Sequence, residues 1–102
     1  MTLDNILEEI KNAETILILT HENPDGDAIG SATAMHLALK ELGKKSDILI
    51  EDYPKTFDFL PAMDVIKKES EIKKYDLVIT VDCATTKLLG NYLEYFENAK
   101  SK

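Results

Sequence analysis

Residues 15–31, which read TILILTHENPDGDAIGS, join an apolar run to a helical pattern through a loop that carries one imidazole and two carboxylates. The first six residues have the composition of a buried strand, and apolar residues recur at helical spacing over residues 28–42. We therefore predict that His21 lies at the carboxyl end of a strand, Asp25 in the turn and Asp27 at the N-cap of the helix.

A plain turn is the alternative interpretation of this loop, since Asn, Pro, Asp and Gly are common turn residues. A second acidic strand end argues against it, because the short β-rich run over residues 75–81 stops at Asp82. In an open α/β sheet, ligands bind outside the carboxyl ends of the strands, where the strand order reverses. We therefore expect four side chains to converge at that edge: His21, Asp25, Asp27 and Asp82.

The remaining patterns predict alternating helices and strands. An apolar stripe marks a first helix, with Leu3, Ile6, Leu7 and Ile10 on its core side. The second helix is expected to end at Gly43 and to bury Ile29, Ala32, Met35, Leu39 and Leu42. Residues 46–52 predict a strand, residues 63–66 a short edge strand and residues 86–99 a final helix. This order predicts an α/β fold, a Rossmann-like three-layer sandwich with a mostly parallel sheet and right-handed crossovers.

Length and composition favour one small globular domain over residues 1–102. The chain is 44% hydrophobic and 30% charged, which is ordinary for a soluble protein. Its longest apolar run is far shorter than the roughly 20 residues that cross a bilayer, so we expect no membrane association. The first residues also lack the basic segment of a secretion signal, so we expect a cytoplasmic protein.

The net charge of −7 argues against a clamp for long nucleic acids, since sequence-independent phosphate binding needs an excess of Lys and Arg on one face. An acidic protein can still bind phosphate groups when metal ions supply the positive charge locally. The charge balance therefore favours short phosphorylated substrates over a polymer.

Several other reactive or aromatic residues have an ordinary structural interpretation. Cys83 follows Asp82 directly, but a single thiol at a strand end is more often a small buried group than a nucleophile or metal ligand. His36 lies mid-helix, too far from the loop to share its ion easily, so we expect a surface or boundary position. The aromatic residues of the last predicted helix, Tyr92, Tyr95 and Phe96, are expected to pack rather than to bind a ligand.

The two strand-end motifs resemble those of the DHH phosphoesterases, and among these the oligoribonucleases that also act as 3'-phosphoadenosine 5'-phosphate phosphatases. Residues 21–31 match the first motif of the family closely, and Val81-Asp82 followed by Leu89-Gly90 is similar to the second. The resemblance implies a hydrolase with two Mn²⁺ ions, Mg²⁺ being the alternative, and a bridging water that attacks phosphorus. It also implies short oligoribonucleotides or nucleotide phosphates as substrates, and leaves a homodimer open.

By resemblance, His21, Asp25 and Asp82 would hold one ion, and Asp27 with Asp82 would contribute to the other. Asp82 would bridge the two ions, so Asp27 and Asp82 are the catalytic candidates. The chemistry is consistent, because carboxylates suit Mn²⁺ and imidazole is compatible with it. Two ions roughly 3.5–4 Å apart can stabilise both the attacking and the leaving oxygen.

The sequence also departs from the family pattern. The Asp-His-His triplet that names the family is absent, since the only histidines are His21 and His36. The later acidic ligand and the C-terminal substrate domain are missing too, and Leu88 stands where many relatives have Arg. We therefore expect the N-terminal part of a DHH catalytic domain, truncated before the triplet and inactive by itself.

Three hypotheses stay open from the sequence. The first is a metal-dependent phosphoesterase domain. The second is a receiver-like domain in which Asp82 accepts a phosphoryl group, although this leaves His21 and Gly26 without a role. The third is a metal-binding or scaffolding fragment without turnover.

Overall fold

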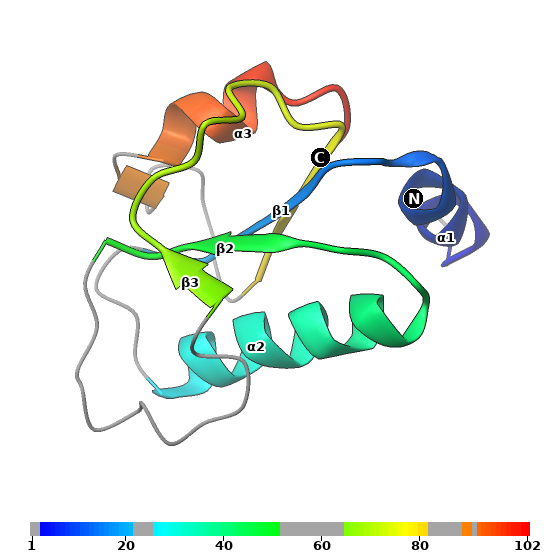
Figure 1. The fold of residues 1–102 in the computed structure, drawn as a ribbon, viewed down its shortest axis with the longest axis horizontal. Coiled ribbons are helices and arrows are strands. Elements are labelled where there is room, and N and C mark those ends of the chain that lie inside the picture. The colour runs from blue at the N-terminus through cyan, green and yellow to red at the C-terminus, as the bar shows by residue number, and fades with distance from the viewer. Residues whose placement is uncertain (1–2, 22–25, 52–64, 82–88, 91) are drawn as a thin grey trace.

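The computed structural model describes residues 3–21, 26–51, 65–81, 89–90 and 92–102 (Figure 1). Within these ranges the elements follow one another in the order α1 (Leu3–Asn12), β1 (Ile16–Leu19), α2 (Gly26–Glu41), β2 (Asp47–Leu49), β3 (Ile66–Lys67), β4 (Leu77–Thr80) and α3 (Leu93–Asn98). Among these described residues, no helix is both long and apolar enough to span a bilayer.

The described strands form one parallel sheet in the order β3-β2-β1-β4. The chain runs from β1 outward through β2 to β3, and then returns to the other side of β1 to form β4. The strand order therefore reverses between β1 and β4, which are paired in the register Ile16↔Leu77 to Leu19↔Thr80. The predicted α/β fold with a parallel sheet is confirmed.

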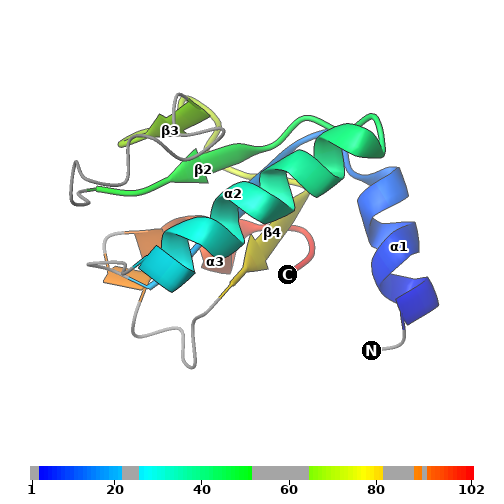
Figure 2. The ribbon, with the colours of Figure 1, turned by 90° about the horizontal axis from the view of Figure 1, so that it is seen from below.

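Helices cover both faces of the sheet, as α2 lies on one side and α3 on the other (Figures 1 and 2). The side chains of β1 contribute to both faces of the sheet, because successive side chains of a strand point in opposite directions. Ile16 and Ile18 join the buried cluster that contains Ile29 of α2, whereas Leu17 and Leu19 join the cluster packed against α3. This arrangement is the expected three-layer sandwich.

The core face of α2 agrees with the sequence pattern at four of five positions. Ile29, Ala32 and Leu39 are buried, and Met35 packs against the same cluster. The prediction for Leu42 is wrong, since its side chain is 59% exposed. Leu42 lies just beyond the end of the helix, so the helical spacing that places the other four residues on the core face no longer applies to it.

The predicted stop at Gly43 is confirmed. Its φ of 78° lies in the left-handed region, which glycine adopts without a steric penalty. The N–H of Lys44 donates to the carbonyl of Leu39 at 2.8 Å, and the N–H of Gly43 donates to the carbonyl of Lys40 at 2.9 Å. These two bonds form a Schellman motif, which satisfies the last carbonyls of α2.

The apolar stripe of α1 is only partly buried, which corrects the prediction that its whole length faces the core. Ile10 is buried, but Ile6 and Leu7 are each 41% exposed. The helix lies at one end of the molecule, and among its residues whose burial the structure describes, Ile10 in the last turn joins the cluster beneath α2 (Figure 2).

The final helix is shorter than predicted for residues 86–99. In the described part of that range the α-helix spans Leu93–Asn98, and Gly90 has a φ of 59°. A left-handed residue cannot continue a right-handed helix, so the pattern is interrupted there. Leu89 is nevertheless buried, in a short 3₁₀ segment, which shows that the apolar pattern is satisfied there without a continuous α-helix.

The aromatic residues near α3 pack together, as expected. Tyr92, Tyr95 and Phe96 surround the buried cluster that contains Tyr75, and the rings of Tyr75 and Tyr95 are tilted with centroids 6.3 Å apart. The Tyr75 hydroxyl donates to Asp47 at 2.7 Å. Burial is the main cause that raises the pKa of Tyr75 well above its usual value.

The strands predicted for residues 46–52 and 63–66 are present with shifted boundaries. Strand β2 occupies the centre of residues 46–52, and the edge strand β3 overlaps residues 63–66 only at Ile66. Ile66 pairs with Ile48 in parallel, so β3 extends the sheet on the side away from β4. Residues 63 and 64 lie outside the described residues.

Candidate metal centre

The carboxyl end of β1 lies beside the carboxyl end of β4, at the point where the strand order reverses. Leu19 pairs with Thr80, and the N–H of Val81 donates to the carbonyl of Leu19 at 2.9 Å. The two strands therefore remain together to their ends. His21 follows two residues after Leu19 and is half-buried, so its predicted place at a strand end is confirmed.

Asp27 lies in the first turn of α2, and its side chain is exposed. The predicted N-cap position is wrong, because the helix already begins at Gly26. A carboxylate in the first turn is still favoured by the positive end of the helix dipole. The start of α2 and the end of β1 lie at the same edge of the sheet, so Asp27 and His21 share that edge (Figure 1).

Two of the four predicted ligands, Asp25 and Asp82, lie outside the described residues, as does Cys83. Their convergence with His21 and Asp27 therefore stays a prediction. In the part of the chain that the structure describes, no three His, Cys, Asp or Glu side chains are grouped closely enough to hold a metal ion.

Thr20 is a residue of this edge that sequence reasoning missed. Its side chain is only 4% exposed, and its Oγ1 has no hydrogen-bond partner in the described structure. A buried hydroxyl without a partner costs about 1–3 kcal/mol, so such atoms are rare in folded proteins. The sequence carried no signal for it, because a β-branched residue is ordinary in a strand. An orphaned polar atom directly before His21 fits an edge that binds an ion or a polar ligand.

His36 is not part of this edge, in agreement with the sequence interpretation. Its Nδ1 lies 2.8 Å from the Oγ of Ser46, and its ring is half-buried on the side of α2 that faces the start of β2. This hydrogen bond joins the helix to the following strand. His36 is therefore a boundary residue with a structural partner.

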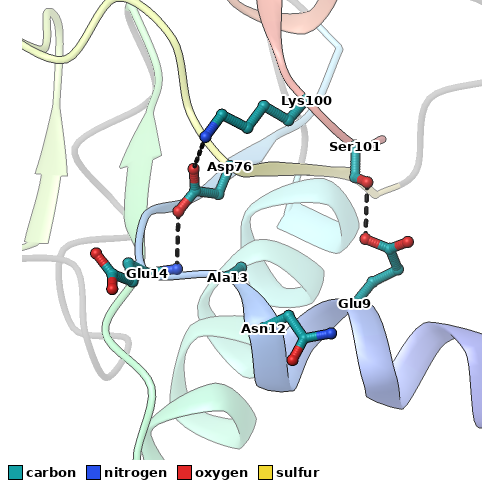
Figure 3. A pocket seen from close by; sticks show the side chains of 7 residues that line it. All are labelled: Glu9, Asn12, Ala13, Glu14, Asp76, Lys100 and Ser101. Atoms are coloured by element: carbon teal, nitrogen blue, oxygen red, sulfur yellow. Dashed lines mark hydrogen bonds and ion pairs between the residues drawn. The ribbon is translucent and has the colours of Figure 1, made fainter.

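A polar pocket of about 430 Å³ lies at the opposite end of the strands (Figure 3). At its centre, Asp76 accepts hydrogen bonds from the backbone N–H groups of Glu14 at 2.9 Å and Thr15 at 3.3 Å. Lys100 lies 3.4 Å from the other carboxylate oxygen. The N–H bonds, that of Glu14 first, lower the pKa of Asp76. These polar groups of the pocket are therefore hydrogen-bonded or ion-paired to one another, and these contacts hold together chain segments that are distant in the sequence. The pocket is not the ion site.

The described fold defines a class: an open α/β domain whose parallel sheet reverses its strand order between β1 and β4, which is where domains of this class usually bind ligands. The model of the family described as "DHH family, N-terminal domain" matches residues 15–102. The chain therefore belongs to the DHH family and carries its N-terminal domain.

Comparison with individual proteins agrees with this assignment. Over 57 residues the chain is 46% identical to the bifunctional oligoribonuclease and PAP phosphatase NrnA of Thermus thermophilus, a match that covers 55% of this chain and 17% of that protein. The crystal structure of an exopolyphosphatase-related protein from Bacteroides fragilis superposes with a TM-score of 0.79 at 21% identity, over 88% of this chain and 29% of that one. The chain thus spans well under half the length of either protein, and the second match shows the fold.

Proposed function

We propose that this chain is the N-terminal part of a metal-dependent phosphoesterase that hydrolyses short oligoribonucleotides, 3'-phosphoadenosine 5'-phosphate, or both. The observation that carries the proposal is the place of His21, which follows β1 where the strand order reverses, in a chain of the DHH family. The similarity to a protein named as an oligoribonuclease and PAP phosphatase supports the substrate class.

We assign His21, Asp25 and Asp82 to one Mn²⁺ ion, and Asp27 with Asp82 to a second. The strand ends support this assignment, because His21 follows β1 and Val81, the residue before Asp82 in the sequence, follows β4, and β1 and β4 are paired where the strand order reverses. Carboxylates and one imidazole suit Mn²⁺, and Mg²⁺ is the alternative ion.

The residues of the edge have distinct tasks in this proposal. His21 presents its imidazole from the end of a buried strand, a rigid support that favours a defined ligand geometry. Asp27 presents a carboxylate from the first turn of α2. When bound, the ions supply an activated water and stabilise the charge of the phosphate oxygens. Because the chain has a net charge of −7, local cations also offset its repulsion of an anionic substrate.

The metal assignment is tested by titration calorimetry of the purified chain with Mn²⁺. We expect binding by the wild type and its loss in Asp82→Ala. Glu71→Ala is the matched control, because it removes an exposed carboxylate distant in sequence from both motifs. Equal binding by the wild type and Asp82→Ala, or an equal loss in both variants, contradicts the assignment.

Family membership favours the phosphoesterase over the receiver-like domain, which also leaves His21 without a role. A metal-binding fragment without turnover has the same ligands as the phosphoesterase. Turnover by a longer chain that includes the missing triplet distinguishes the two.

A further inference from the structure

The hydroxyl of Thr20 lies in a part of the sheet that is otherwise aliphatic. Ile16 and Ile18 of β1 belong to the cluster beneath α2, and alternation places Thr20 on the same face. Val81 packs against this cluster too, and its N–H donates to the carbonyl of Leu19, the residue before Thr20, at 2.9 Å. Thr20 Oγ1 is therefore a buried polar atom among apolar neighbours.

Packing offers no reason for a hydroxyl at this position. Valine has nearly the same shape as threonine and a high β propensity, and it carries no polar atom that needs a partner. Two other buried hydroxyl residues of the structure have partners: Thr33 donates to the carbonyl of Ile29 at 3.0 Å, and Ser46 bonds to His36 at 2.8 Å. The Thr20 hydroxyl has no such partner in the part of the protein that the structure describes, which indicates that a bound ligand supplies the partner.

We propose that Thr20 is a positioning residue for the ion site: its Oγ1–H donates a hydrogen bond to an oxygen bound to the cation and thereby orients that oxygen. The proposal rests on the proposed function, because the cation is what holds such an oxygen beside the end of β1. Thr20 and His21 directly follow β1, so both residues leave the sheet at the strand end where the cation is proposed to bind. Hydrogen bonds of this kind orient metal ligands, and their removal lowers metal affinity.

The test compares Thr20→Val with Thr20→Ser by Mn²⁺ titration calorimetry and by thermal unfolding without metal. We expect Thr20→Val to lower Mn²⁺ affinity by roughly 10–100-fold while its metal-free melting temperature stays unchanged or rises. Thr20→Ser keeps the hydroxyl and should retain most of the affinity, although it loses a buried methyl group and should melt lower.

Thr33→Val is the matched control, because Thr33 and Thr20 are both 4% exposed and the substitution removes the same atom. Its hydroxyl bonds within α2, so we expect unchanged Mn²⁺ affinity. Wild-type binding that Thr20→Val leaves intact overturns the role of Thr20 but not the metal site. A Thr20→Val chain that melts lower or does not fold shows a structural hydroxyl and also overturns it, as does weak binding by Thr20→Ser. Absence of binding by the wild type refutes the proposed function itself.

Discussion

At the scale of single residues, Asp27 is subject to two opposing electrostatic effects. Its carboxylate lies in the first turn of α2, where the helix dipole favours a negative charge by about 0.3–1 kcal/mol. In the proposed site it also lies near other carboxylates, and like charges disfavour joint ionisation. The two effects therefore act in opposite directions on the stability of the metal-free protein.

Asp27→Asn should therefore change metal-free stability by less than about 1 kcal/mol, or raise it, while Mn²⁺ affinity falls. Urea unfolding measures the first quantity and calorimetry the second. The substitution keeps the size of the side chain and removes only its charge. A large loss of metal-free stability would mean that Asp27 has a structural task, and unchanged Mn²⁺ affinity would remove it from the site.

At the scale of elements, α2 contains a glycine that packing does not require. A Cβ added at Gly30 meets no atom within 4 Å. Glycine in a helix interior is less stable than alanine by roughly 0.5–1 kcal/mol, because it loses more backbone entropy on folding. Gly43 also has open space around an added Cβ, but its φ is 78°.

Gly30→Ala should therefore raise the free energy of unfolding by about 0.5–1 kcal/mol. Gly43→Ala is the matched control and should lower it by about 1 kcal/mol, since only the backbone conformation differs between the two sites. Chemical denaturation of both variants provides the measurement. A destabilised Gly30→Ala chain would show that the space beside α2 is filled in the folded protein.

At the scale of the whole molecule, the pocket of Figure 3 joins segments that are distant in the sequence. Asp76 connects the loop before β1 to the segment that precedes β4, and Lys100 adds the end of the chain. A carboxylate whose pKa is lowered in the folded state stabilises that state at pH values above its unfolded pKa of about 4. This contribution is lost as the pH falls through the lower folded pKa.

Asp76→Asn should therefore be less stable than the wild type at neutral pH, and the difference should shrink below about pH 4. Urea unfolding of both proteins across the acidic range measures this dependence. A difference that stays constant with pH would show that the Asp76 charge contributes nothing and that only its shape matters.

Catalysis also depends on parts of the enzyme beyond single residues and elements. The chain supplies at most Asp27 and Asp82 to the second proposed ion, and the Asp-His-His triplet is absent from it. Much of the rate of an enzyme also comes from positioning the substrate against the nucleophile, which a separate substrate domain would provide.

With Mn²⁺, this chain should hydrolyse neither 3'-phosphoadenosine 5'-phosphate nor a short oligoribonucleotide at an enzyme-like rate. A longer chain that includes the triplet and the substrate domain should hydrolyse at least one of them. Release of phosphate and of mononucleotides measures the two activities. Robust activity of residues 1–102 that disappears in Asp27→Ala would mean that the missing ligands are dispensable or come from a partner chain.

Features that depend on a few neighbouring residues could be predicted from the amino-acid order alone. The strand before His21, the helix that contains Asp27 and the stop at Gly43 follow from side-chain periodicity and backbone sterics, which act locally. The parallel sheet also follows, because strands that alternate with helices have few other arrangements. The His21 part of the candidate site was predictable for the same reason, since a residue after a buried strand lies at a sheet edge.

Which strands are neighbours and which apolar residues remain exposed depends instead on how the whole chain packs. The pairing of β4 with β1 is a contact across about sixty residues, and local patterns carry no information about that choice. The exposure of Ile6 and Leu7 depends on where α1 lies, and the amphipathic stripe is the same in either case. Thr20 shows the limit most clearly: its β-branched shape suits any strand, but whether its hydroxyl finds a partner depends on every element that surrounds it.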